Sequence, residues 1–250
     1  MSILEQASVP EMGAQIITFC GDAGVGKSSL AATFPNPIFI RGEDGVSRIP
    51  EAFRPQALPV VRAEATLWEQ LKALIHEEHG FKTVVIDTVS ALDRMFATEI
   101  LKQDGKAKSV NQALGGYGAG FSALAARHQQ LRNGAEMLRL KRGCHVIFLA
   151  HTEIDTVRPP DQDDYSRYSL RMTHNKSLPP YLDDVDAVGF LRQKIVVRGD
   201  DGERKKAISG TERELVMQLT AANVSKNPYG ITEPLSVKLG ENPLAEFLKG

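Results

Sequence analysis

One octapeptide near the start of the chain limits the possible folds and functions more than any other stretch. It fits the pattern G-x-x-x-x-G-K-[ST], and its members are Gly21, Asp22, Ala23, Gly24, Val25, Gly26, Lys27 and Ser28. Glycine backbones can curl tightly and turn several N–H groups toward one anion, because no side chain obstructs the approach. The pattern therefore predicts a loop that holds a phosphate chain.

The segments on either side of this loop support the prediction. Residues 14–20 have the apolar pattern of a short strand, and residues 27–34 that of a helix ended by Pro35. The N-terminus of such a helix would face the phosphates. Lys27 can reach the β- and γ-phosphates, and Ser28 can ligate Mg²⁺. We predict that these loop residues, with Ser29 after them, bind a nucleotide.

Composition places limits on the rest of the chain. Its 250 residues suit one large α/β domain, and no apolar run approaches the length of a membrane span. Residues 1–13 lack the pattern of a signal peptide, and both cysteines lie beside apolar runs, which favours buried thiols in a reducing cytoplasm. We predict a flexible arm over residues 1–13, a single domain over 14–250 and no zinc site. With a formal net charge of −1, any nucleic-acid contact would need a local basic patch.

An aspartate further along the chain is a second candidate ligand for Mg²⁺. Residues 83–87 have the pattern of a buried strand, and Asp87 stands at its end. In an open parallel sheet, ligands bind at the carboxyl ends of the strands. We therefore predict that Asp87 and Ser28 hold Mg²⁺, against the alternative that Asp87 is an ordinary residue at a strand end.

The remaining periodic segments predict a mostly parallel sheet flanked by helices, with antiparallel strands near the C-terminus. Helices are expected at 66–80, with a capping box formed by Thr66 and Glu69, and at 92–103 and 121–140. Further strands are expected at 37–41, 58–62, 145–150, 187–197 and 214–220, with a polar turn at 199–206 and a short strand after the turn at 224–230.

Two irregular stretches carry basic and aromatic residues. Residues 104–120 form a glycine-rich segment with nearby lysines and one tyrosine. Residues 154–180 begin with four aspartates and continue with alternating basic and aromatic side chains. Cations there could hold the phosphates of single-stranded DNA while bases stack on the tyrosines; the candidates are Arg158, Tyr165, Arg167, Tyr168, Arg171 and Lys176. The alternative is a solvated polar loop, because the aspartates oppose the positive charge.

The order of these segments resembles the RecA-type ATPase core. Residues 38–43 look like the strand that ends in the water-activating glutamate, 84–92 like the segment of the metal-binding aspartate, and 146–151 like the strand that ends in a γ-phosphate sensor. The two irregular stretches fall where RecA proteins carry their DNA-binding loops. The guanine-specificity motif Asn-Lys-x-Asp does not occur, which disfavours a GTPase.

The chain is more similar still to the small phage RecA-like ATPases of the single-strand annealing protein family. Most of residues 15–235 share their near-minimal core, N-terminal P-loop, Tyr-Gly pair before a long helix and late Lys-Asn turn. This resemblance implies a RecA-like P-loop fold and ATP hydrolysis with Mg²⁺, stimulated by single-stranded DNA. It also implies a single-strand-binding protein as partner and a homo-oligomer, ring or filament, with ATP at the interface between protomers.

The resemblance also implies roles for three residues. Glu43 would activate water, although Asp44 beside it competes for that role, and His151 would sense the γ-phosphate, unless it is an ordinary strand-end histidine. Lys226 would reach the ATP of a neighbouring protomer. The chain departs from the pattern in having histidine where bacterial recombinases commonly have glutamine, and Pro228 where related helicases often have arginine.

Two functions are consistent with these features. The first is an ATP-dependent, single-stranded-DNA-binding protein of phage recombination that acts in the host bacterial cytoplasm and promotes annealing or strand pairing. The alternative is a P-loop interaction module that its bound nucleotide switches and that does not bind DNA. The ATPase rate with and without single-stranded DNA separates the two.

Overall fold

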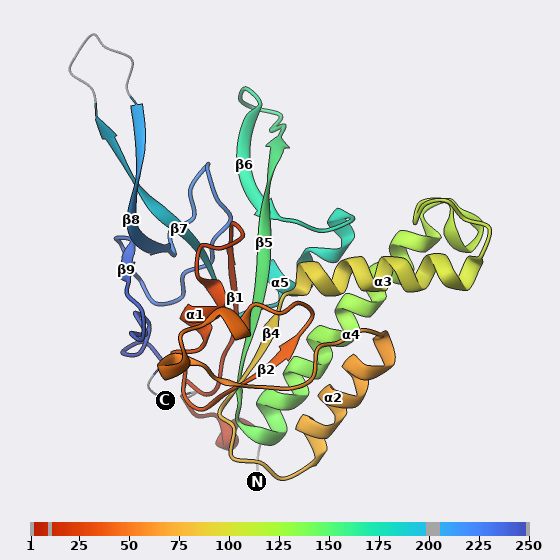
Figure 1. Cartoon of the computed structure of the whole chain (residues 1–250), viewed down its shortest axis with the longest axis horizontal. Helices are drawn as coiled ribbons and strands as arrows, with labels where there is room; N and C mark the ends of the chain where they lie inside the picture. The colour runs from red at the N-terminus through yellow and green to blue at the C-terminus, as the bar shows by residue number, and fades with distance from the viewer. Residues whose placement is uncertain (1–2, 10–11, 199–205, 249–250) are drawn as a thin grey trace.

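A mixed β-sheet runs through the centre of the molecule, with helices on both faces (Figure 1). The computed structural model describes residues 3–9, 12–198 and 206–248. Within these ranges the strands are β1 (Ile16–Gly21), β2 (Pro37–Arg41), β3 (Gln56–Ala57), β4 (Thr83–Asp87), β5 (His145–Val157), β6 (Tyr165–Leu170), β7 (Ala187–Arg198), β8 (Lys206–Val216) and β9 (Leu235–Val237). The α-helices are α1 (Lys27–Ala31), α2 (Glu64–His76), α3 (Val89–Asp104), α4 (Ala119–Arg142) and α5 (Pro179–Leu182).

The strand order confirms the predicted fold class. Along the sheet the order is β3-β2-β4-β5-β1-β7-β8-β9, and β6 pairs with β5 outside this path. The strands from β3 to β7 are parallel, and β8 and β9 add antiparallel pairs. Strand β5 lies between β1 and β4, with His151 in register with Gly21. The carboxyl ends of these three strands therefore meet at one edge of the sheet.

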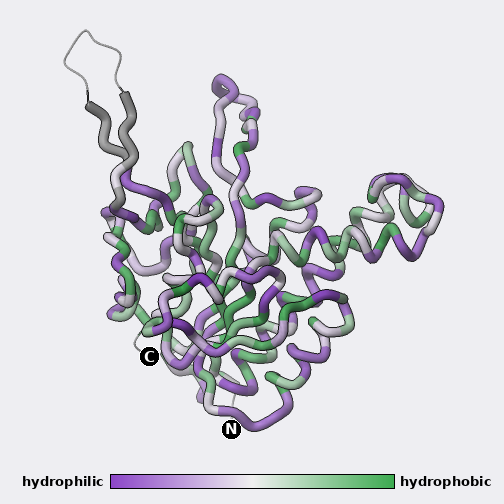
Figure 2. The backbone as a smooth tube through the Cα atoms, in the orientation of Figure 1, coloured by the Kyte–Doolittle hydropathy of each residue, from purple (hydrophilic) through white to green (hydrophobic). Residues whose placement is uncertain are grey.

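Two hydrophobic cores cover the two faces of the sheet. Alternate residues of β1 point to opposite faces, so Ile16 packs with α2, α3, α4 and α5, whereas Ile17 packs with α1 and the C-terminal segment. Burial on both faces explains why the parallel strands are continuous apolar runs in the sequence. Figure 2 shows these apolar residues gathered in the centre of the molecule.

Several predicted boundaries were wrong. The strand expected at 58–62 is replaced by the two-residue β3, because Pro59 cannot donate to a ladder; the chain still follows β2 through hydrogen bonds from Leu58 and Val61. Helix α2 begins at Glu64 without a side-chain cap, so the predicted capping box at Thr66 does not form. Helix α1 ends at Ala31, earlier than predicted. Of the strand expected at 214–220, only residues 214–216 belong to a strand, as the end of the longer β8.

The stretch expected to be irregular at 154–180 contains a β-hairpin. Strand β5 continues past the sheet to Val157 and pairs antiparallel with β6. This β5–β6 hairpin projects from the sheet, as do β7 with β8 and the α3–α4 connection (Figure 1). At the end of the α3–α4 projection, Tyr117 has a φ of 50° and a fully exposed ring.

Part of the predicted N-terminal arm forms the 3-10 turn η1 (Ile3–Gln6). Most of the polar turn expected at 199–206 lies outside the described residues. None of the described helices is both long and apolar enough to cross a membrane.

Candidate active site

The loop predicted to bind phosphate joins β1 to α1. Gly24 and Gly26 have φ angles of 79° and 102°, values that side chains other than glycine rarely permit. Helix α1 begins at Lys27, directly after this curl. The local geometry is therefore the strand–loop–helix arrangement that the motif predicts.

Lys27 lies at the base of the loop. Only 5% of the residue is exposed, and its Nζ donates to the carbonyl oxygens of Gly21 (2.8 Å) and Asp22 (2.9 Å). The same Nζ lies 3.3 Å from Nδ1 of His151. Burial lowers the pKa of Lys27, and the negative charge of Asp87 opposes that shift. A buried ammonium group is thus held at the carboxyl end of the sheet.

The two predicted metal ligands are brought together. Ser28 Oγ donates to Asp87 Oδ2 at 2.6 Å, across the gap between α1 and β4. Gly45 passes close to both, since a Cβ there would lie 3.1 Å from Ser28 Oγ and 3.2 Å from Asp87 Oδ2. The described residues contain no cluster of three or more His, Cys, Asp or Glu side chains suited to a metal. Ser28 and Asp87 could therefore hold Mg²⁺ only together with phosphate oxygens and water.

Glu43 and His151 form a hydrogen-bonded pair beside Lys27. His151 Nε2 lies 2.8 Å from Glu43 Oε1, and the Thr88 hydroxyl donates to the same oxygen at 3.2 Å. Because an ammonium group can only donate, Nδ1 of His151 accepts from Lys27, and Nε2 carries the proton that Glu43 accepts. The hydrogen bond from His151 lowers the pKa of Glu43, which keeps this carboxylate ionised.

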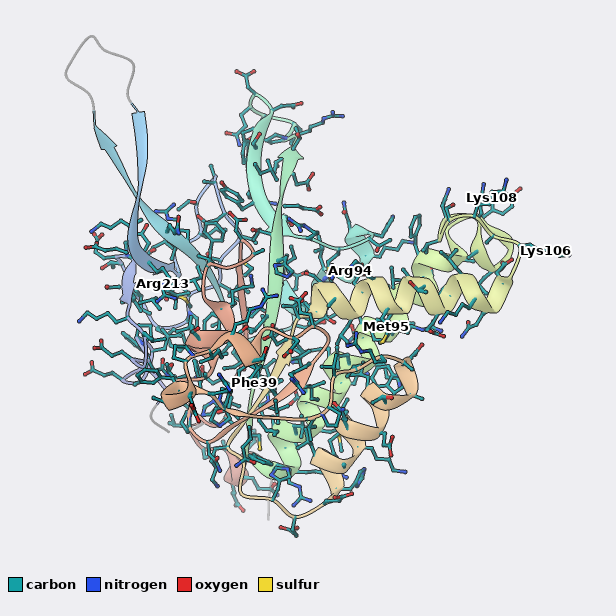
Figure 3. The ribbon with its side chains drawn as sticks, viewed as in Figure 1. Phe39, Arg94, Met95, Lys106, Lys108 and Arg213 are labelled. Atoms are coloured by element: carbon teal, nitrogen blue, oxygen red, sulfur yellow. The ribbon has the colours of Figure 1, made fainter. Side chains whose placement is uncertain are left out.

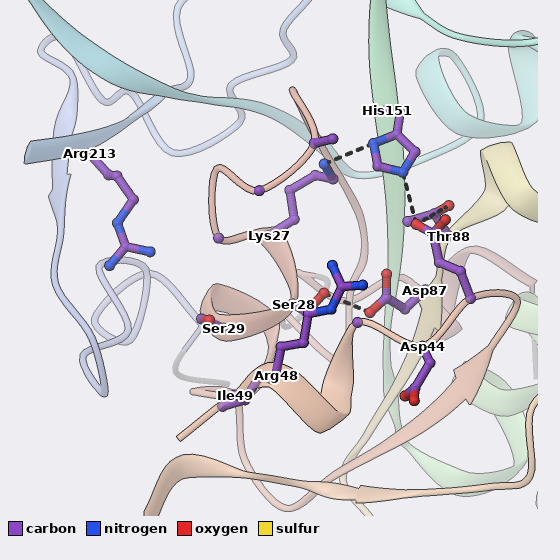
Figure 4. A pocket seen from close by; sticks show the side chains of 15 residues that line it. Lys27, Ser28, Ser29, Asp44, Arg48, Ile49, Asp87, Thr88, His151 and Arg213 are labelled. Carbon is purple, nitrogen blue, oxygen red and sulfur yellow. Dashed lines mark hydrogen bonds and ion pairs between the residues drawn. The ribbon is translucent and has the colours of Figure 1, made fainter. Parts of the chain in front are cut away.

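Asp44, the alternative to Glu43, is placed differently. Its carboxylate is exposed and forms an ion pair with Arg41 at 3.0 Å. In Figure 4 it points away from Lys27 and His151. Of the two acids, Glu43 is therefore the one that contacts His151 beside Lys27.

These residues surround a cavity of about 480 Å³ (Figure 4). Five residues that line the cavity were not predicted from the sequence: Gly45, Arg48, Ile49, Thr88 and Arg213. Thr88 follows Asp87 within a recognised segment, but the motif assigns it no role, and the other four belong to no recognised motif. Arg213 of β8 lies against the P-loop, since a Cβ on Gly26 would be 2.2 Å from Arg213 Nη1. A concave site with inward-facing loop glycines, a buried lysine and a serine–aspartate pair fits a nucleotide with Mg²⁺.

Lys226 is not brought to this cavity within the same chain. Its backbone pairs with Val188, near the start of β7. Its Nζ donates to the carbonyl oxygens of Asp183 (2.9 Å) and Val185 (2.5 Å). These positions are at the amino ends of the strands, opposite the P-loop.

The predicted DNA-binding residues lie on or just after the β5–β6 hairpin, and several already have partners. Arg158 forms an ion pair with Asp164 at 3.3 Å, and the Tyr168 ring stacks on Phe190 with centroids 5.0 Å apart. Arg171 donates to the Thr152 carbonyl at 2.9 Å, and Lys176 to the Ser122 hydroxyl at 3.4 Å.

The base of this hairpin is joined to the P-loop. Thr152, the residue after His151, is buried and donates to Asp22 Oδ1 at 2.8 Å. Arg171, which follows β6, donates its backbone N–H to the His151 carbonyl at 2.8 Å. The two ends of the hairpin are therefore fixed to the P-loop residue Asp22 and to His151.

The fold and the arrangement around the cavity define a P-loop NTPase. The family described as AAA domain matches residues 14–229, and the chain belongs to this family. Membership indicates a nucleotide-binding protein with ATPase activity in general. A comparison with curated proteins returned no match.

The buried Asp87 predicts a pH dependence of nucleotide binding. Burial raises its pKa from 3.8 to about 6; the hydrogen bond from Ser28 opposes this shift, and the negative charge of Glu43 adds to it. Asp87 of the nucleotide-free protein is therefore protonated below about pH 6. This protonation stabilises the fold fully below pH 3.8, and the contribution is lost as the pH rises through about 6. Because Mg²⁺ needs the carboxylate, we expect binding of preformed Mg-ATP to weaken below pH 6 and to release a proton there.

Calorimetric titration in two buffers of different ionisation enthalpy measures that proton. The heats should differ between buffers near pH 6 and agree well above it, and Asp87→Asn should abolish the difference. Equal heats near pH 6 would contradict the assignment of Asp87.

Proposed function

We propose that this protein is a Mg²⁺-dependent ATPase that binds single-stranded DNA and promotes annealing or strand pairing in phage recombination, in the host bacterial cytoplasm. The observation that carries the ATPase is the convergence of Lys27, Ser28, Glu43, Asp87 and His151 on one cavity. A single-strand-binding protein is the expected partner of such an activity, as in the phage proteins that the sequence resembles.

The chain's own residues suit this chemistry. Bound Mg-ATP supplies the phosphoanhydride that water cleaves. Lys27 is placed to bind phosphate oxygens once it leaves the carbonyls of Gly21 and Asp22. The hydrogen bond from His151 lowers the pKa of Glu43, so its carboxylate is ionised and can accept a proton from water. The same hydrogen bond holds the carboxylate in place.

The proposal that DNA binds rests on the β5–β6 hairpin and the segment after it. Arg167 lies in β6, Arg171 directly follows β6 at the base of the hairpin, and Lys176 lies in the 3-10 turn Asn175–Ser177 beyond it. Three cations thus occur on and after the hairpin, which begins beside the cavity residue His151. Such a spacing of cations suits the successive phosphates of a single strand. Lys106 and Lys108 lie on the separate α3–α4 projection (Figure 3), which is a second possible contact surface.

The interaction module remains a second candidate because of specific contacts in the hairpin. The guanidinium of Arg158 is paired with Asp164, and the ring of Tyr168 is stacked on Phe190. DNA would need both of these groups for its phosphates and bases. Asp155, Asp161 and Asp163 add negative charge to the same hairpin. A protein partner with basic side chains would suit that surface better than a polyanion.

Removing positive charge from the β5–β6 hairpin and the segment after it distinguishes the two candidate functions. We expect single-stranded DNA to raise the ATPase activity of the wild type. DNA binding should weaken in a triple variant that carries Arg167→Gln, Arg171→Gln and Lys176→Gln. Each lost phosphate contact lowers the log–log salt slope by about 0.7, so three contacts lower it by about 2. The slope is measured by titrating labelled DNA at several salt concentrations.

A matched variant in which Lys102, Lys106 and Lys108 become glutamine removes the same charge from the other projection. If only this control flattens the slope, DNA binds at the α3–α4 connection instead. No binding by the wild type, and no stimulation by DNA, would favour the interaction module.

We further propose a head-to-tail ring or filament in which Lys226 reaches the ATP of the neighbouring protomer. The support is its position at the end of the molecule opposite Lys27, which a head-to-tail contact would bring together with the next P-loop. Lys226→Ala and Lys27→Ala should each be inactive. Mixing the two proteins should restore some turnover, since one interface keeps both functional residues.

The mixing experiment is measured as ATPase rate against protein concentration, with co-assembly checked by light scattering. Normal hydrolysis by Lys226→Ala alone would contradict the assignment. In that case the contacts of Lys226 with Asp183 and Val185 are its structural role.

A further inference from the structure

Arg48 stands on a short, anchored turn beside the metal site. Residues Val46–Arg48 form the 3-10 turn η2, which follows Glu43. Val46, the first residue of the turn, and Ile49, the residue after it, are only 2% and 3% exposed, so both ends of the turn are anchored in the core. Arg48 between them is exposed and lines the cavity, and Figure 4 shows its guanidinium group directed toward Ser28 and Asp87.

The backbone of this turn lies close to the metal ligands. Gly45 could not carry a Cβ without tight contact with Ser28 Oγ and Asp87 Oδ2. The N–H of Arg48 donates to the Gly45 carbonyl at 3.3 Å, which fixes Arg48 one turn away from that close approach. A side chain as long as arginine therefore reaches the region where the metal and its phosphate ligands would lie.

The Arg48 guanidinium has no hydrogen bond and no ion pair within the described part of the chain. The neighbouring acids are engaged elsewhere: Asp44 with Arg41, Glu43 with His151, and Asp87 with Ser28. A cation that lines a nucleotide cavity without an acidic partner is suited to bind an anion.

We propose that Arg48 binds the β- and γ-phosphates of ATP bound to its own chain. This inference rests on the proposed ATPase function and adds to it a second cation, beside Lys27, that needs no neighbouring protomer. Phosphoryl transfer requires such positive charge near the γ-phosphate, supplied by the same chain or by another. The planar fork of arginine can bind two phosphate oxygens through two parallel N–H donors in a fixed geometry, which the ammonium group of lysine does not provide.

Substitutions at Arg48 test this inference through binding as well as turnover. We expect Arg48→Ala to weaken ATP binding about tenfold or more and ADP binding less, because ADP lacks the γ-phosphate. Turnover at saturating ATP should fall roughly 100-fold or more. Arg48→Lys should lie between Arg48→Ala and wild type, and Arg62→Ala, an exposed arginine outside the cavity, should match wild type.

Mixing separates action within one chain from action on a neighbour. Arg48→Ala mixed with Lys27→Ala should recover no turnover, since each chain then lacks one cation at its own site. Recovery would overturn the inference by showing that Arg48 acts on the next protomer.

Two other results would also overturn it. The first is that Arg48→Ala binds and hydrolyses ATP like wild type. The second is that Arg48→Ala lowers the unfolding temperature measured without nucleotide and weakens the binding of ATP and ADP equally, which would indicate a structural role. If the wild type itself bound no ATP, the ATPase proposal would fail together with this inference. If the wild type binds ATP and only the Arg48 results disagree, the ATPase proposal stands.

Discussion

The Glu43→Gln variant is expected to bind ATP as tightly as wild type and to hydrolyse it roughly 100-fold more slowly or worse, as loss of a general base requires. The amide has nearly the same shape, and its oxygen can still accept from His151 and Thr88, which contact Glu43 Oε1 at 2.8 and 3.2 Å. What it loses is the ability to take a proton from water. Calorimetric binding and a phosphate-release assay measure the two effects separately.

Asp44→Asn is the matched control for this prediction. Asp44 is the adjacent carboxylate, but it is exposed and paired with Arg41, so its loss should leave turnover close to wild type. If Asp44→Asn were the inactive variant and Glu43→Gln the active one, the assignment of the two acids would be reversed.

Lys27→Ala is expected to abolish measurable ATP and ADP binding. The buried Lys27 ammonium lies within the curl of the P-loop, where it donates to the carbonyl oxygens of Gly21 and Asp22. Without it, both carbonyl oxygens lose a donor, and the phosphates lose their main positive charge. Titration calorimetry with each nucleotide provides the measurement.

Because Lys27 is buried, its removal could disturb the fold. The unfolding temperature without nucleotide should therefore be compared with that of Lys27→Met, which preserves the length of the side chain but not its charge. Both variants should fail to bind ATP, and Lys27→Met should unfold close to wild type. Binding by a folded Lys27→Met protein at wild-type affinity would refute the role of Lys27.

The fold and the centre of the site could be predicted because their signals are local. The P-loop pattern specifies its own backbone, and apolar runs buried on both faces mark β1, β2, β4 and β5. Asp87 and His151 were recognised because each stands at or just past the end of such a run.

The features that could not be predicted depend on contacts between segments that are distant in the sequence. Arg213 reaches Gly26 only because β8 pairs antiparallel with β7, which in turn pairs with β1. Most of the β5–β6 hairpin is exposed or half-buried and polar, and its few apolar residues do not alternate regularly, so the sequence does not distinguish it from a loop. Arg48 stands in a turn whose buried neighbours, Val46 and Ile49, are recognisable only once the core is assembled.

Strand β5 has one further consequence. It runs without interruption from the middle of the sheet to the tip of its hairpin, so no joint separates His151 from Thr152. His151 contacts both Lys27 and Glu43, and Thr152 contacts Asp22. Any molecule whose affinity for the hairpin differs between the ATP-bound and ATP-free protein must, by reciprocity, change the affinity for ATP by the same factor. Binding at the β5–β6 hairpin is therefore expected to be coupled to nucleotide binding through the continuous strand β5.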